Sequence, residues 1–192
     1  MDELTAPVIE VTTAWRDIVT MWKELEAPEG WRAEFDGENI TMSPPPGHRH
    51  ELIADDLHWQ LRRAAPEGCG VFQHLGVEIM SVGRLCIPDL VVVAREDVAT
   101  PTPADRVLLV AEITSPSNAD TDRVDKLRAY AHGPIPLYLL VDRWDKDGPA
   151  ATLYSEPDGK VYQRIQRVDF GGSVAVPGPF GIELDTSDFP SR

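Results

Sequence analysis

Two stretches in the N-terminal third place hydrophobic residues three and four positions apart, which is the spacing of an amphipathic helix. The first, residues 13–26, begins at a threonine that can cap it and carries Trp15, Ile18, Val19, Trp22 and Leu25. The second starts at His48, in HRHELIADDLHWQLRRAA, and carries Leu52, Ile53, Leu57 and Leu61. Between them, WRAEFDGENITMS predicts a hairpin that turns at Asp36 and Gly37.

Later stretches have the length and composition of strands. Three successive strands are predicted at 70–80 (GVFQHLGVEIM), 84–94 (RLCIPDLVVVA) and 106–114 (RVLLVAEIT), and the last two are apolar enough to be central in a sheet. A helix over about 121–131 and a strand at LYLLVD follow. The tail from 150 to 176 alternates loosely and predicts additional antiparallel strands. This order of elements predicts an α/β (α+β) fold with a mixed central sheet flanked by helices.

A carboxylate interrupts one of these buried runs, in LLVAEITSP. The four residues before Glu112 are apolar and Ile113 follows it, and an unpaired ionised group in such a strand costs several kcal/mol. Asp89 stands directly before the apolar run of the preceding strand. Because adjacent strands lie about 5 Å apart, the two carboxylates can converge on one point.

A divalent cation between Asp89 and Glu112 would let both charges be buried together. Carboxylate and carbonyl oxygens with water suit Mg²⁺ or Mn²⁺, and the main-chain carbonyl of Ile113 is a candidate for a further ligand. The alternatives are ordinary structural roles. Asp89 could cap a turn, and Glu112 could be a core acid paired with a buried arginine or lysine.

Lys126 is the candidate for a third catalytic group. It lies one helical turn after Asp122 and one turn before Tyr130, so the three side chains share a stripe that can face the strand ends. An ammonium there could orient the attacking water and stabilise charge that develops on a phosphate. The alternative is a surface pair between Lys126 and Asp122 on a solvated helix face.

Two further residues are candidates for substrate contact. His50 could contact phosphate or water at the mouth of the cleft, or it could be a helix-start histidine in solvent. Tyr130 is expected to pack in the core with its hydroxyl directed toward the cleft.

Composition limits the function classes. The net charge of -14 argues against a general DNA-coating protein, because nonspecific binding depends on neutralising phosphates with Lys and Arg. A metal-loaded cleft could still meet phosphate. Two cysteines without CxxC spacing make a disulfide framework or a structural zinc site unexpected. One domain over residues 1–192, no membrane span and a cytoplasmic location are predicted.

The segments PDLVVV and VAEITSPSNADTDRVDKLRAYAHGPIPLYLLVD resemble the PD-(D/E)XK nuclease superfamily and, within it, the restriction-endonuclease-like Uma-two family. The likeness extends to WRAEFDGENITMSPPPGHRHELIADDL and covers about residues 13–145. The superfamily's usual lysine lies two residues after the glutamate, where this chain has Thr114. The Uma-two family shares that departure, so the resemblance assigns the lysine's role to Lys126 by analogy.

The resemblance implies a restriction-endonuclease-like core at about 28–145, with a C-terminal strand extension at about 150–185. It also implies a homodimeric, metal-dependent endonuclease that cleaves DNA with Asp89, Glu112 and Lys126 and leaves a 5′-phosphate. Two other functions stay open. One is a catalytically inactive nuclease fold that binds a partner or regulates, which the acidic charge favours, and the other is a hydrolase of a small phosphoester.

Overall fold

The computed structural model describes residues 11–116 and 118–191. Its helices are α1 (Val11–Glu24), α2 (His48–Ala64), α3 (Leu127–His132), the π-helix η4 (Thr121–Lys126) and three short 3-10 turns, η1 (Met80–Val82), η2 (Arg95–Asp97) and η3 (Ala104–Arg106). Its strands are β1 (Arg32–Phe35), β2 (Ile40–Ser43), β3 (Cys69–Phe72), β4 (Val77–Ile79), β5 (Arg84–Cys86), β6 (Leu90–Ala94), β7 (Thr102–Pro103), β8 (Val107–Ile113), β9 (Leu137–Asp142), β10 (Ala150–Pro157), β11 (Tyr162–Asp169), β12 (Ser173–Val176) and β13 (Ile182–Asp185).

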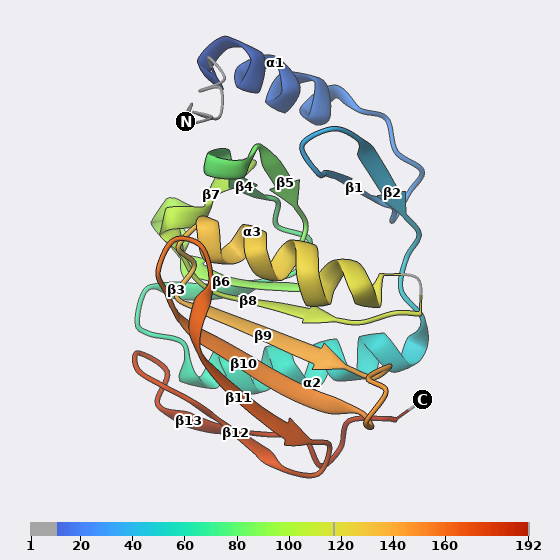
Figure 1. Cartoon of the computed structure of the whole chain (residues 1–192), viewed down its shortest axis with the longest axis vertical. Helices are drawn as coiled ribbons and strands as arrows, with labels where there is room; N and C mark the ends of the chain where they lie inside the picture. The colour runs from blue at the N-terminus through green and yellow to red at the C-terminus, as the bar shows by residue number, and fades with distance from the viewer. Residues whose placement is uncertain (1–10, 117, 192) are drawn as a thin grey trace, which may run out of the picture.

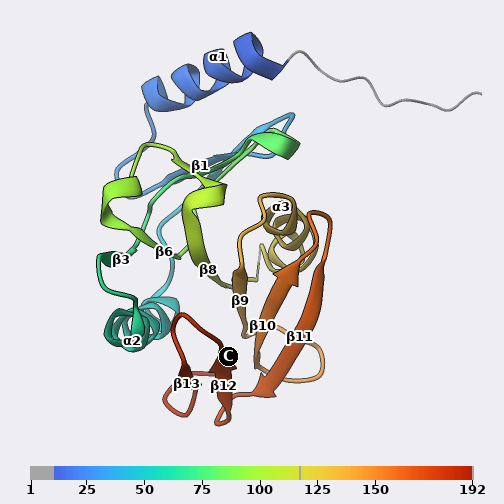
Figure 2. The same cartoon turned by 90° about the vertical axis from the view of Figure 1, so that its left-hand side faces the viewer.

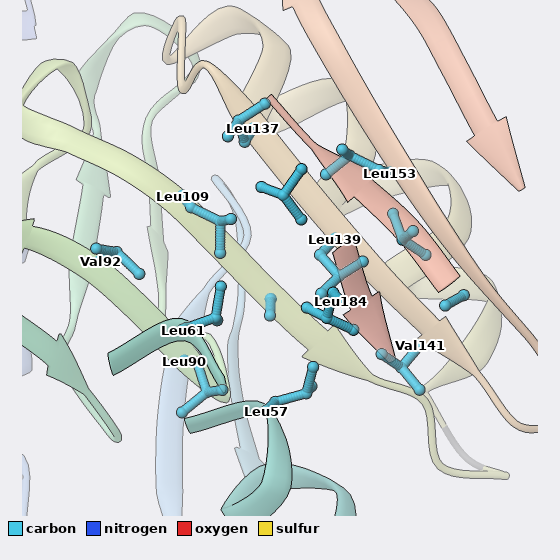
Figure 3. Packing of buried hydrophobic residues seen from close by; sticks show 14 of the residues in the cluster. Leu57, Leu61, Leu90, Val92, Leu109, Leu137, Leu139, Val141, Leu153 and Leu184 are labelled. Atoms are coloured by element: carbon cyan, nitrogen blue, oxygen red, sulfur yellow. The ribbon is translucent and has the colours of Figure 1, made fainter. Parts of the chain in front are cut away.

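A six-stranded mixed sheet in the order β11-β10-β9-β8-β6-β3 forms the centre of the fold. Its β8 and β9 are parallel and its other neighbours are antiparallel. Helix α2 covers one face and α3 the other (Figures 1 and 2). On the α2 side, Leu57 and Leu61 belong to one buried cluster with Leu90 and Leu109 of the sheet, and Leu61 extends toward Leu109 (Figure 3). Both faces of β8 are therefore buried, which confirms that this apolar run is a central strand.

A smaller five-stranded sheet in the order β2-β1-β5-β4-β7 lies beside the first. Its outer face packs on α1 through a cluster of Trp15, Phe35 and Leu85. The β1–β2 hairpin turns at Asp36, whose carboxylate accepts the backbone N–H groups of Glu38 and Asn39. The predicted hairpin and both N-terminal helices are present within a few residues of their expected bounds.

Two predicted strands are wrong as single elements, because each is divided between the two sheets. The stretch 70–80 separates into β3 and β4 around His74, which has a positive φ of 57°. The stretch 84–94 separates into β5 and β6. Between them lies Pro88, which has no backbone N–H to continue a ladder. This crossing places Asp89 at the junction of the two sheets, where it can meet side chains from both.

The C-terminal strands extend the fold as expected. Strands β10 and β11 add antiparallel neighbours to β9, and β12 pairs with β13. The Gln60 side chain of α2 exchanges two 2.8 Å hydrogen bonds with the backbone of Asp185, which ties this last hairpin to the core. Within the described residues, no helix has the length and apolar character needed to cross a membrane.

Candidate active site

Asp89 and Glu112 lie next to each other where the two sheets meet. Strands β6 and β8 pair antiparallel with Leu90 opposite Ala111, and continuing this register by one residue places Asp89 opposite Glu112. Directly opposed residues in such a pair have Cα atoms about 4.5–5.5 Å apart. The N–H of Ile113 also donates to Asp89 Oδ2 at 2.7 Å. The two acids are therefore neighbours across the paired strands, and a metal ion shared between them stays a prediction.

Asp89 is surrounded by donors. Arg32 Nη1 donates to Oδ1 at 2.6 Å, and His50 Nε2 lies 3.0 Å from Oδ2, which also accepts the Ile113 N–H. Burial by itself would raise the pKa of Asp89. The His50 hydrogen bond and charge, the Arg32 charge and the Ile113 N–H outweigh burial and lower this pKa to about 2. Asp89 is therefore ionised across the physiological pH range.

Glu112 has a different environment. It is 1% exposed, and its Oε1 accepts hydrogen bonds from Lys126 Nζ at 3.0 Å and from the hydroxyl of Tyr130. Burial raises its pKa, Lys126 opposes that rise, and the charges of Asp122 and Asp89 add to it, with the result that the pKa is about 8. The sequence predicted a metal as the compensating charge, but in this structure the immediate partner of Glu112 is a protein cation.

Lys126 is the centre of a buried group of acids. Its Nζ lies 3.0 Å from Glu34 Oε1, 3.0 Å from Glu112 Oε1 and 3.6 Å from Asp122 Oδ1. Burial alone would lower the pKa of Lys126, but these three carboxylates raise it well above its ordinary value. Lys126 itself is only 6% exposed, so it does not form the solvated surface pair considered as an alternative.

His50 and Tyr130 are both buried. His50 contacts Asp89, so the interpretation of a solvent-exposed helix-start histidine is wrong. Tyr130 packs in the core, as expected, with its hydroxyl on Glu112. A direct contact of either side chain with substrate stays a prediction.

Two charged residues of the site, Arg32 and Glu34, were missed from the sequence, whereas Asp122 was expected on the stripe with Lys126. Arg32 and Glu34 alternate on β1, so both side chains project from the same face of that short strand. Asp122 is fully buried on η4, and neither of its carboxylate oxygens has a hydrogen-bond partner. Its pKa is raised to about 7, mainly by burial, which the Lys126 charge opposes. The alternation in RAEF was the available signal for Arg32 and Glu34.

The cluster holds more acids than permanent cations. Glu34, Asp89, Glu112 and Asp122 are the four carboxyls, and Lys126 and Arg32 are the two cations that stay charged. Burial is the main cause of the raised pKa values of Glu112 and Asp122, and the charges of the neighbouring carboxylates add to it. The negative charge that the two permanent cations leave unbalanced would be matched by one divalent cation.

The oxygen atoms of the cluster can supply only some of the ligands that a metal ion needs. A carboxylate oxygen has two lone pairs, and on Asp89 those of Oδ2 are used by His50 and Ile113, while Oδ1 faces Arg32. Among residues 11–116 and 118–191, no three His, Cys, Asp or Glu side chains are arranged to hold a metal ion together. The residues thus fit an ion of the Mg²⁺ type, which commonly takes one or two carboxylates and completes its shell with water and substrate phosphate.

A cleft of about 440 Å³ opens beside the cluster, between the inner face of the five-stranded sheet and η4. Arg32, Glu34 and Arg84 line it from the sheet, and Asp122 and Lys126 line it from the helix. A larger groove of about 730 Å³ lies between β11 and the β12–β13 hairpin, and none of the clustered acids line it. The smaller cleft, which Glu34, Asp122 and Lys126 of the cluster line, is therefore the candidate place for the chemistry.

The metal-free protein is expected to lose stability as pH rises from about 5 to 8. Glu112 and Asp122 have folded-state pKa values of about 8 and about 7, above their ordinary values of 4.5 and 3.8. In this window the folded state binds more protons than the unfolded state, so the free energy of unfolding falls with pH. Urea unfolding in EDTA across this range measures it, and Glu112→Gln should reduce the slope. A stability that climbs toward pH 8 would contradict these assignments.

Comparison with known proteins identifies the family of the chain. A model of the Uma2 family, described as "Putative restriction endonuclease", matches residues 20–187. The chain is similar to a crystal structure from Anabaena variabilis described as "a putative nuclease belonging to DUF820", with a TM-score of 0.68 and 18% identity. That match covers 89% of this chain and 96% of the other, and it confirms the predicted nuclease-like fold. No curated protein matches. Because the family model matches most of this chain's sequence, the chain belongs to the Uma2 family.

Proposed function

We propose that this protein is a metal-dependent endonuclease that hydrolyses phosphodiester bonds of DNA. The observation that carries the proposal is that Glu112 lies opposite Asp89 across β6 and β8 and pairs with Lys126, which lines a cleft, in a cluster with more carboxyls than cations. Membership of a family described as restriction endonucleases supports the same reaction class.

Asp89 and Glu112, with the main-chain carbonyl of Ile113, would hold the ion. When bound, Mg²⁺ or Mn²⁺ supplies an activated water at neutral pH and stabilises negative charge on the phosphate. Asp89 is prepared for this role by His50 and the Ile113 N–H, which keep its carboxylate ionised and fix its orientation.

Lys126 would assist attack at the phosphate. Its ammonium lies 3.0 Å from Glu112 and lines the cleft, so it can orient a water held near Glu112 and stabilise the charge that develops in the transition state. Glu34 and Asp122 hold this ammonium in place and keep it protonated.

A cleavage assay tests the proposal directly. Supercoiled, linear and single-stranded DNA are incubated with the protein in Mg²⁺, Mn²⁺ or EDTA, with Glu112→Gln as the blank. We expect cleavage that needs the metal and falls by about 10³-fold in Glu112→Gln, because about 4 kcal/mol of transition-state stabilisation is lost. Equal cleavage by both proteins would show that the activity comes from elsewhere.

A hydrolase of a small phosphoester is the second candidate, and the net charge of -14 favours it over a duplex-binding enzyme. A chromogenic phosphodiester assayed beside plasmid separates the two. Turnover of the small ester with intact plasmid would support this candidate, whereas plasmid cleavage supports the nuclease.

We also propose that the enzyme acts as a homodimer, since two sites make it easiest to cut both strands of a duplex. Light scattering on the purified protein tests this. A mass near twice 21.3 kDa is expected, and a monomer that cuts both strands would contradict it.

A further inference from the structure

Arg32 reaches from the wall of the cleft into the acid cluster. Its Nη1 lies 2.6 Å from Asp89 Oδ1 and 3.4 Å from the carbonyl oxygen of Ile87. The side chain is 14% exposed and lines the cleft. It is therefore in contact both with an acid of the site and with the space a substrate would enter.

The position of Arg32 conflicts with metal binding at Asp89. The two lone pairs of Oδ2 are directed to His50 and to the Ile113 N–H, so Oδ1 is the oxygen best placed to bind an ion. Oδ1 is also the oxygen that Arg32 contacts. A guanidinium stays charged at every relevant pH, so it cannot be neutralised and has to move when a cation arrives.

Arg32 is easier to release than Lys126. Three carboxylates lie within 4.0 Å of the Lys126 ammonium. Within the described part of the chain, Asp89 is the one carboxylate at that distance from Arg32. Both side chains line the cleft, but that of Arg32 is 14% exposed and that of Lys126 is 7% exposed.

We propose that Arg32 competes with the divalent cation for Asp89 and that, once displaced, it turns into the cleft and contacts the substrate phosphate. A guanidinium matches phosphate oxygens with paired donors. Metal binding would thus release the arginine that holds the substrate, and the metal-free site would be held closed by the Arg32–Asp89 pair. This inference rests on the proposed nuclease function for its phosphate partner.

The first test is Mn²⁺ binding alone, measured on the full chain by electron paramagnetic resonance. Arg32→Gln is expected to bind Mn²⁺ at least about tenfold more tightly than the wild type. Arg84→Gln is the matched control, because Arg84 lines the same cleft but, within the described residues, forms no hydrogen bond or ion pair with Asp89. It should change the affinity by less than about threefold. Weaker or unchanged binding in Arg32→Gln would overturn the proposal.

The second test is binding of a single-stranded oligonucleotide with hydrolysis-resistant phosphorothioate linkages in saturating Mn²⁺. Arg32→Gln should weaken this binding at least about tenfold, and Arg84→Gln less. Opposite changes in metal and oligonucleotide affinity are the signature, because a merely structural role of Arg32 would weaken both. Weakening of both therefore counts against the proposal.

The two proposals can fail separately. If the wild type neither binds nor cleaves DNA but Arg32→Gln tightens Mn²⁺ binding, the nuclease function fails and the competition stands. If the wild type cleaves DNA and Arg32→Gln leaves Mn²⁺ binding unchanged, Arg32 is not the competitor. If Arg32→Gln does not fold, Mn²⁺ binding is measured on Arg32→Lys instead. The lysine side chain is one atom shorter than that of arginine and lacks the Nη1 that contacts both Asp89 and Ile87, so Mn²⁺ binding at least about threefold tighter is expected.

Discussion

Lys126→Met is expected to lower the free energy of unfolding by about 3–5 kcal/mol, the cost of removing one partner from a buried ion pair. The substitution leaves Glu34, Glu112 and Asp122 without the ammonium they share. The loss should be larger at pH 8 than at pH 5, because at low pH Glu112 and Asp122 take up protons, and their pKa values are already raised to about 8 and about 7.

Urea denaturation of the metal-free protein measures this effect. Lys146→Met is the matched control, since the Lys146 side chain is 89% exposed and lies 3.6 Å from the carboxylate of the exposed Asp147. It should change the free energy of unfolding by less than about 0.5 kcal/mol. A Lys126→Met protein as stable as this control would show that Lys126 does not neutralise the buried acids.

Asp89→Asn is expected to abolish Mn²⁺ binding and to slow DNA cleavage by about 10³-fold or more. The amide has nearly the shape of the carboxylate but no charge, so it loses the attraction to a cation and the pairing with Arg32 and His50. Loss of a metal's contribution of several kcal/mol corresponds to this drop in rate.

Asp125→Asn is the control for Asp89→Asn, because Asp125 lines the cleft beside the cluster and is exposed. It removes the same charge without touching the acids at the junction of the sheets, so near-normal Mn²⁺ binding and cleavage are expected. Equal losses in the two variants would indicate that general acidity of the cleft, rather than Asp89, attracts the metal.

Much of the site could be predicted because its signals are local. The apolar runs around Asp89 and Glu112 identify central strands, and such strands are neighbours in a sheet. The helical spacing of Lys126 and Tyr130 correctly places both on the side that faces Glu112. In these cases the position of a carboxylate or ammonium within a regular element determines where its side chain lies.

The missed parts depend on contacts between distant segments. Arg32 and Glu34 lie on a four-residue strand that reaches the site only through the packing of the two sheets. Nothing near them in sequence indicates that Arg32 meets Asp89, 57 residues later. The same packing explains why Glu112 was assigned a metal as its counter-charge, because the burial of Lys126 beside it depends on how the helix packs against the sheets.

The most direct test of a shared ion at Asp89 and Glu112 is a crystal structure of the wild-type protein soaked in Mn²⁺, read from the anomalous signal. We expect one peak bonded to Asp89 Oδ1 and to a Glu112 oxygen at about 2.0–2.3 Å, with the Arg32 guanidinium turned into the cleft. A map with no anomalous peak between these carboxylates at saturating Mn²⁺, and with Arg32 still on Asp89, would contradict the account.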